Sequence, residues 1–343
     1  MKKLLNTLYI LSEDSYSALD GENIVILSGE KTVGRYPLHT LQSIVCFSYK
    51  GASPALMGKC ARMQIDLSFF TPHGRFLART CGESQGNVLL RRTQYRMADE
   101  PHESCELAKA FLIGKIYNAR WQLERATRDH PDRVDVKRLK QISEFLAQSI
   151  RNIAGCSDME QLRGYEGEAA QKYFGVLDEL ILQNRSVFSF SGRSRRPPLD
   201  PTNAVLSFVY TLLANACASA LEGVGLDSYV GFLHRDRPGR TSLALDLMEE
   251  LRAVFADRLV VTLINTRKIN AKHFETRENG AVFLNDMGRK IVLQAWQERK
   301  QEKIRHPFLE ESIPWGLVPH VQALLLARFL RGDMDGYPPF LWK

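Results

Sequence analysis

The pattern of apolar residues changes once along the chain, near residue 83, and this change most constrains the fold. Before it, short runs rich in β-branched and aromatic residues predict strands. These runs read TLYIL, NIVIL, SIVCFSY, QIDLSFF and RFLART. Asp20-Gly21 separates two of them and predicts a hairpin, and residues 54–63 predict one short helix. The first part of the chain is therefore expected to be β-rich.

Beyond this point apolar residues recur at three- and four-residue spacing, which predicts helices. The expected helices span residues 86–97, 102–128, 135–153, 158–184 and 202–222. We therefore expect an α+β protein with two domains. An N-terminal β-rich domain covers residues 1–85, residues 86–100 form the linker and the start of the helices, and residues 101–343 form a larger, almost wholly α-helical domain.

Size and composition allow a large core and limit the functional classes. The chain has 343 residues, of which 44% are hydrophobic and 25% charged, as is usual for a globular protein. A net charge of +7 suits an anionic partner without establishing one. The six cysteines include no CxxC pair, so a zinc ribbon or a redox motif is not indicated. Scattered thiols fit a reducing, cytoplasmic location.

Neither of two apolar segments is expected to enter a membrane. The N-terminal run resembles a signal peptide for a few residues, but Glu13 and Asp14 follow it at once and no small-residue cleavage site appears. Residues 205–221 are uncharged but short and contain several polar side chains. We interpret them as a buried core helix.

One carboxylate lies within the apolar face of the expected helix at residues 158–184. At about 100° per residue, Glu166 falls among apolar side chains such as Ala169, whereas Glu168 falls outside that face. A carboxylate in such a position is costly unless it is paired, protonated or bound to a metal. Two interpretations stay open, namely a salt bridge to a neighbour such as Arg163 and a functional carboxylate.

The segment GFLHRDRPGRTSLALDLMEE, residues 231–250, brings imidazole and carboxylate groups close together in the chain. His234 precedes a loop, and the following helix carries Asp246, Glu249 and Glu250 at spacings that share a face. The alternatives are a structural histidine and a solvated acidic face. Combined with a carboxylate from a distant helix, this mixed set of nitrogen and oxygen ligands suits Mg²⁺ or Mn²⁺ rather than a structural zinc.

Two arginine clusters lie in loops near these residues. The guanidinium group matches the geometry of phosphate oxygens, so the clusters are candidates for binding a DNA backbone. The alternative for each cluster is a solvated surface. The candidate DNA-binding residues are Arg193, Arg195, Arg196, Arg235, Arg237 and Arg240.

Several long motifs, in the same order, resemble a known family over essentially the whole chain. These are LYILSEDSYSALDGENIVI, LRGYEGEAAQKYF, PPLDPTNAVLSFVYTLL, HRDRPGRTSLALDLMEELR and YPPFLWK. The chain thereby resembles the CRISPR-associated endonuclease and integrase of the adaptation module, the family of the first-named Cas protein, in its subtype I-C branch.

The resemblance implies roles for the candidate residues. The metal ligands would be Glu166, His234 and Glu249, and Asp246 would lie beside the metal as a fourth catalytic residue. Many relatives carry aspartate at the position of Glu249, so glutamate there is a departure from the family pattern. The residue pattern leaves open whether Asp246 or Glu250 also contacts the metal.

The resemblance also implies a reaction and partners. The expected activity is metal-dependent cleavage of DNA and insertion of captured fragments as new spacers into a CRISPR array, by attack of a 3′-hydroxyl on a phosphodiester. Expected partners are DNA, a second copy of the chain bound through the β-rich domain, and a small second CRISPR-associated protein. The alternatives are a catalytically inactive DNA-binding scaffold and a metal hydrolase of small phosphate esters, although the chain lacks a Gly-rich nucleotide loop.

Overall fold

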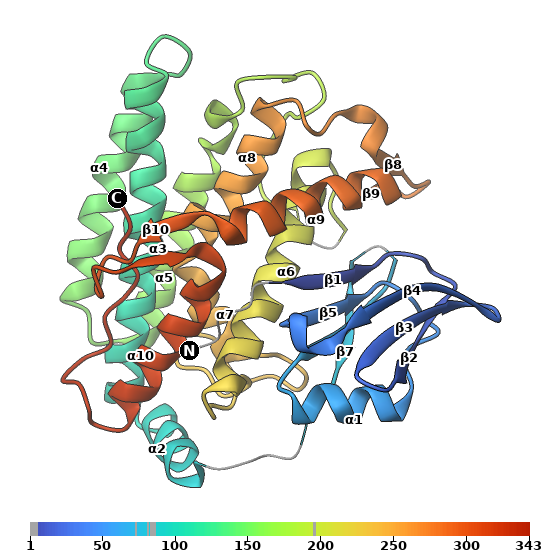
Figure 1. The fold of residues 1–343 in the computed structure, drawn as a ribbon. Helices are drawn as coiled ribbons and strands as arrows, with labels where there is room; N and C mark the ends of the chain where they lie inside the picture. Colours follow the sequence, from blue (N-terminus) through green and yellow to red (C-terminus); the bar gives the residue numbers. More distant parts are fainter. Residues whose placement is uncertain (1–5, 73, 81, 83–86, 195–196) are drawn as a thin grey trace.

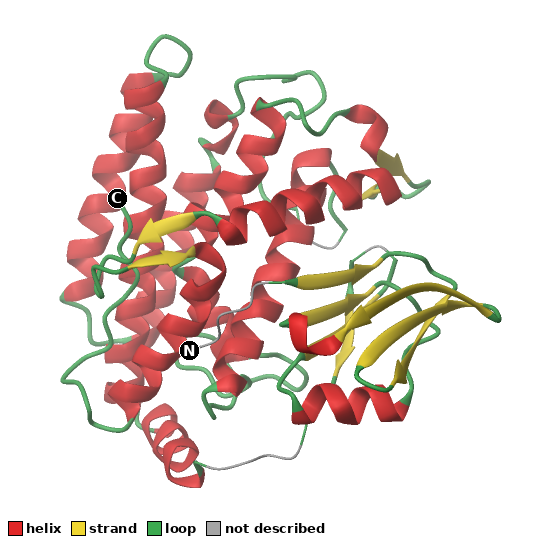
Figure 2. Ribbon diagram, viewed as in Figure 1, coloured by secondary structure: helices red, strands yellow, loops and turns green. Residues whose placement is uncertain are grey.

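The computed structural model describes residues 6–72, 74–80, 82, 87–194 and 197–343. Figure 1 shows the N-terminal strands gathered on one side of the molecule and most of the helices on the other. The same division is visible by secondary structure in Figure 2. The predicted α+β fold, with a β-rich start and a mostly helical remainder, is confirmed.

A four-stranded sheet with the order β1-β5-β6-β7 forms one half of the N-terminal part. Its strands are β1 (Thr7–Ile10), β5 (Ser43–Cys46), β6 (Asp66–Phe70) and β7 (Phe76–Arg79). The first three are parallel, and β7 is antiparallel to β6. Parallel neighbours need a crossover, and α1 (Pro54–Arg62) supplies it between β5 and β6. Ser53 starts this helix by accepting a hydrogen bond from Leu56 N–H.

A three-stranded antiparallel sheet forms the other half. Its strands are β2 (Ser15–Asp20), β3 (Asn23–Ser28) and β4 (Lys31–Pro37). The predicted turn at Asp20-Gly21 is confirmed, with Gly21 at a φ of 59°. The turn was predicted to join TLYIL to NIVIL, and this pairing is wrong. TLYIL forms β1 in the other sheet, and the turn joins β2 to β3. The inward-facing positions of β2 include two serines, Ser15 and Ser17, which are both buried. The sequence of β2 therefore lacks the alternation of apolar residues that marks a strand.

The four-stranded sheet contributes to two cores. Ile44 packs with Leu56 and Leu67 in a small core enclosed by the two N-terminal sheets and α1. The neighbouring Val45 and Phe70 belong to the main core of the helical part. Alternate residues of a strand point to opposite faces, so β5 links both cores.

The rest of the chain is built mainly from helices, with short hairpins between them. The main helices are α2 (Val88–Asp99), α3 (Pro101–Asp129), α4 (Val136–Ala154), α5 (Met159–Phe174), α6 (Pro201–Gly223), α7 (Ser242–Glu249), the π-helical turn η3 (Arg252–Asp257), α8 (Arg258–Asn265), α9 (Asp286–Gln301) and α10 (Val318–Leu330). The hairpins pair β8 (Phe274–Thr276) with β9 (Val282–Leu284) and β10 (Lys303–Arg305) with β11 (Ser312–Pro314). The expectation of an almost wholly helical second part therefore omitted two hairpins of three-residue strands.

The helix predicted at residues 158–184 is shorter than expected. It ends at Phe174, and the chain continues as a 3₁₀ turn at Leu177–Leu180. Three apolar residues that follow this end, Val176, Leu177 and Leu180, are nevertheless buried. Apolar spacing shows which side chains are inside, but a 3₁₀ turn satisfies that spacing as well as another α-helical turn does.

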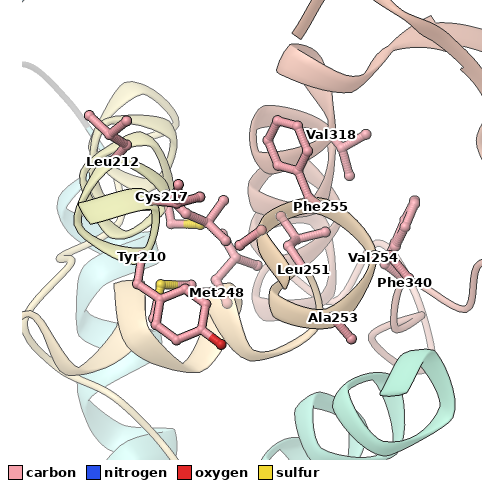
Figure 3. Close-up of a cluster of buried hydrophobic side chains, with 14 of the residues drawn as sticks. Tyr210, Leu212, Cys217, Met248, Leu251, Ala253, Val254, Phe255, Val318 and Phe340 are labelled. Atoms are coloured by element: carbon pink, nitrogen blue, oxygen red, sulfur yellow. The ribbon is translucent and has the colours of Figure 1, made fainter. Parts of the chain in front are cut away.

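The helix α6 is the central helix of the main core. Its length and composition would allow it to cross a membrane, but 61% of its most apolar window is buried inside the protein. Figure 3 shows Tyr210 and Cys217 of this helix facing the π-helical turn η3 across the core. The expectation of a buried core helix at residues 205–221 is confirmed.

Candidate active site

Asp246 holds the loop that leads into α7. Its side chain is fully buried, and its carboxylate accepts hydrogen bonds from the backbone N–H groups of residues 232, 233 and 234, at 2.7, 3.1 and 3.1 Å. A carboxylate that receives several amide donors is compensated for its burial. Asp246, Glu249 and Glu250 are all buried, so the interpretation of a solvated acidic face is wrong.

The same loop requires glycine at position 231. A Cβ placed on Gly231 would lie 2.8 Å from Asp246 Oδ2 and 2.8 Å from the Cβ of Ser242. Both neighbours are buried, and neither can retreat easily. We expect Gly231→Ala to lower the free energy of unfolding by about 1–3 kcal/mol, as overpacking commonly does, measured by urea denaturation.

Gly223 offers a matched control for that variant. It lies at the end of α6, and a Cβ there would meet nothing within 4 Å. Gly223→Ala should leave the free energy of unfolding unchanged or slightly higher, since alanine favours helix over glycine. An equal loss of stability in the two variants would contradict the close contact at Gly231.

His234 is oriented by Asp246. Its Nδ1 lies 2.6 Å from Asp246 Oδ1, and its Nε2 lies 3.8 Å from Glu249 Oε1. An Nδ1–H that donates to a carboxylate leaves Nε2 with a lone pair, which is the arrangement of many metal-binding histidines. The imidazole thus presents Nε2 toward Glu249.

Glu249 is a buried carboxylate surrounded by cations. Arg252 Nη2 lies 3.0 Å from Glu249 Oε1, and Lys115 Nζ lies 2.9 Å from Oε2. Burial raises the pKa of Glu249, but the charges of Arg252 and Lys115 outweigh burial and lower this pKa to about 2. Glu249 is therefore ionised throughout the physiological pH range.

Glu166 lies on α5 and contacts Lys115, the lysine that also pairs with Glu249. Its side chain is about one-third exposed, at 32%, and its carboxylate forms an ion pair with Lys115 Nζ. The alternative partner considered from the sequence, Arg163, instead donates to the carbonyl oxygen of Leu233 and pairs with Glu160. A salt bridge does exist at Glu166, but its partner comes from α3 rather than from the same helix.

Lys115 is, with Arg252, one of two residues around Glu249 that sequence reasoning missed. It lies on α3 within the run AFLIGKIYN, between the buried Gly114 and Ile116. A lysine inside an apolar run is the same kind of signal that drew attention to Glu166. In the structure Lys115 of α3 forms ion pairs with both Glu166 of α5 and Glu249 of α7.

Glu250 belongs to a different environment. It accepts hydrogen bonds from Tyr337 O–H at 2.6 Å and Phe340 N–H at 2.6 Å, and from the side-chain amide of Gln322 at 2.9 Å. These contacts fasten the C-terminal segment YPPFLWK to the body of the protein. The contacts of Glu250 are thus with the C-terminal segment and Gln322, whereas Glu249 faces His234.

Glu250 predicts a dependence of stability on pH. Burial raises its pKa from 4.5 to about 8, against the opposing hydrogen bonds. A carboxyl whose pKa is raised by folding contributes stability that is fully present below about pH 4.5 and is lost as pH rises through about 8. We expect Glu250→Gln to become progressively more stable relative to the native protein between about pH 5 and pH 8.5, measured by urea unfolding. Glu168→Gln, at an exposed position, should show no such trend.

The candidate DNA-binding arginines have different environments. Arg235 is exposed and pairs with Glu160 at 2.8 Å, Arg237 is exposed, and Arg240 is half-buried. Arg193 is directed inward, donating to Asn203 Oδ1 at 2.6 Å and lying over the ring of Tyr210. Arg195 and Arg196 lie outside the described residues. The cluster after His234 is thus better placed for a surface ligand than Arg193.

The side chains around Glu249 supply the ligand atoms that a divalent metal binds, but the ammonium group of Lys115 lies against two of them. Glu166, His234 and Glu249 supply carboxylate oxygen and imidazole nitrogen. Glu249 Oε2 is buried, and its contact is the 2.9 Å ion pair with Lys115. Among the described residues, no three His, Cys, Asp or Glu side chains are grouped closely enough to hold a metal ion. The ammonium group of Lys115 lies between the two glutamates.

The fold identifies the class of protein. A casposase bound to integration product superposes with a TM-score of 0.84 at 21% identity, covering 98% of this chain and 93% of that chain. A Cas1 protein from Thermotoga maritima gives a TM-score of 0.82 at 21% identity, covering 95% and 97%. The chain therefore has the fold shared by casposases and Cas1 proteins.

Sequence comparison then identifies the family. The family described as CRISPR associated protein Cas1 matches residues 8–298. A CRISPR-associated endonuclease Cas1 of Chlorobaculum tepidum is 51% identical over 343 residues, and one of Rhodospirillum rubrum is 52% identical over 347 residues. Both alignments cover 100% of each chain. The chain belongs to the Cas1 family, as its motifs predicted, and the subtype I-C branch stays a prediction.

Proposed function

We propose that this chain is a metal-dependent DNA endonuclease and integrase that inserts captured DNA fragments as new spacers into a CRISPR array. The observation that carries the proposal is that three separate segments meet around Glu249: Lys115 pairs with both Glu249 and Glu166, and His234 Nε2 lies 3.8 Å from Glu249 Oε1. In the proposed reaction a 3′-hydroxyl attacks a phosphodiester, a new P–O bond forms, and the old P–O bond breaks to release another hydroxyl. Water in place of the 3′-hydroxyl gives cleavage.

The residues of the proposed site have two roles in this reaction, metal binding and the orientation of a metal ligand. Glu166, His234 and Glu249 would hold Mg²⁺ or Mn²⁺, which when bound polarises the phosphodiester and lowers the pKa of the attacking hydroxyl. Asp246 orients His234, since both of its oxygens accept hydrogen bonds from the 231–234 loop. This occupation of its oxygens favours an orienting role over direct contact with the metal.

The proposed partners are DNA, a second copy of the chain and a small second CRISPR-associated protein. The exposed arginines after His234, Arg235 and Arg237, would bind DNA phosphates. Two proteins of similar fold, a casposase bound to integration product and the Cas1 part of a Cas6-RT-Cas1–Cas2 complex, support DNA and a small protein as partners. The β-rich part would form the contact of a twofold dimer, and its outer strand β4 exposes Val33 and Tyr36. A cytoplasmic location without membrane contact completes the proposal.

A strand-joining assay tests the function. The protein, combined with a short duplex with 3′-hydroxyl ends and a plasmid that carries a repeat array, should yield joined products only when Mn²⁺ or Mg²⁺ is present. Binding of the duplex should weaken steeply as salt rises, because neutralised phosphates release counterions. Joining that persists in excess EDTA would contradict metal dependence.

A catalytically inactive scaffold is the second candidate. The observation that favours it is the closure of Glu166 and Glu249 around Lys115. Calorimetric titration with Mn²⁺ separates the two candidates. A bound Mn²⁺ that is lost in Glu249→Gln favours the enzyme, whereas DNA binding with no Mn²⁺ bound favours the scaffold.

A further inference from the structure

We propose that Lys115 is an internal counter-ion that holds Glu166 and Glu249 together until a divalent metal displaces it. Lys115 would thereby set the affinity of the site for metal. The inference rests on the proposed function, because it presupposes that these two glutamates are metal ligands. It adds a positioning residue that competes with the metal for the same carboxylates.

The position of the ammonium group carries the inference. Lys115 Nζ pairs with Glu166 from α5 and lies 2.9 Å from Glu249 Oε2 on α7. The Lys115 side chain is 12% exposed, and that of Glu249 is 3% exposed. The buried carboxylate of Glu249 and the one-third-exposed carboxylate of Glu166 repel one another unless a cation lies between them. Lys115 is the cation that contacts both, whereas the ion pair of Arg252 is with Glu249.

A lysine side chain is suited to a cation that has to move away from the carboxylates when a metal binds. A lysine ammonium is a compact charge on a flexible four-carbon stem, whereas an arginine fork is rigid and holds a carboxylate at two points. Arg252 can therefore stay with Glu249 Oε1 while Lys115 swings away from Oε2. The oxygen that Lys115 contacts, Oε2, is buried.

Calorimetric titration with Mn²⁺ tests the competition. In Lys115→Met the metal no longer has to displace an ammonium group, so its affinity should rise by roughly tenfold or more relative to the native protein. The matched control is Lys109→Met. Lys109 lies on the same helix and is also mostly buried, but it pairs with Glu106, and its replacement should leave the affinity unchanged.

The outcomes separate this inference from the proposed function. If the native protein binds Mn²⁺ and Lys115→Met binds it no more tightly, Lys115 is not a competitor and the proposed function stands. If neither protein binds Mn²⁺, both are overturned. If the affinity rises in Lys115→Met and is lost again when Glu166→Gln is added, both are supported.

A measurement on the native protein covers the case in which Lys115→Met does not fold. Lysine acylation followed by peptide mass spectrometry reports how accessible each ammonium group is. Saturating Mn²⁺ should raise the labelling of Lys115 several-fold and leave that of Lys109 unchanged. Labelling of Lys115 that stays constant while Mn²⁺ binds would overturn the displacement.

Discussion

Glu166→Ala is expected to lower Mn²⁺-dependent cleavage and strand joining by at least about a hundredfold, because loss of a residue that merely orients a metal ligand already costs on the order of 10- to 100-fold. The fold should survive the change. Glu166 is one-third exposed and its ion pair is partly solvated, so the free energy of unfolding should change by less than about 1 kcal/mol. Initial rates of joining at saturating Mn²⁺, with circular dichroism of the same samples, measure both quantities.

Glu168→Ala is the control for this variant. It removes an equal side chain from the same helix two residues later, at an exposed position. Its joining rate should match that of the native protein. Retained activity in Glu166→Ala would show that the site has been assigned to the wrong carboxylate.

Asp246→Asn is expected to be the most destabilising single change in the site, lowering the free energy of unfolding by about 2–4 kcal/mol. Asp246 is fully buried and accepts hydrogen bonds from three backbone N–H groups and from His234. An asparagine amide would turn an NH₂ group toward some of these donors and leave them unpaired. Urea denaturation measures the loss.

The same substitution should reduce catalysis in the molecules that remain folded. Without the carboxylate, His234 loses the partner that fixes its ring and tautomer, which is expected to lower joining by roughly 10- to 100-fold. Asp236→Asn, exposed in the same loop, should change neither stability nor rate. Native stability in Asp246→Asn would contradict the proposal that Asp246 shapes this loop.

Much of the site was visible in the residue pattern, but its burial was not. Glu166 was singled out by its position in an apolar face, and His234 and Glu249 by their spacing and the family resemblance. Asp246, Glu249 and Glu250 looked equally exposed, since three acidic residues so close together are usually solvated. The structure buries all three because each has compensating partners: backbone amides for Asp246, cations for Glu249, and the C-terminal segment for Glu250.

The sequence by itself determined that a β-rich start precedes a mostly helical remainder, and it determined the family and the face on which Glu166 lies. These depend on local periodicity and on motifs that are contiguous in the chain. Only the tertiary structure decided that Lys115 bridges Glu166 and Glu249 and that Glu250 contacts the C-terminal segment. These contacts join residues 51 to 134 positions apart and depend on how α3, α5 and α7 pack, and local spacing carries no information about such packing.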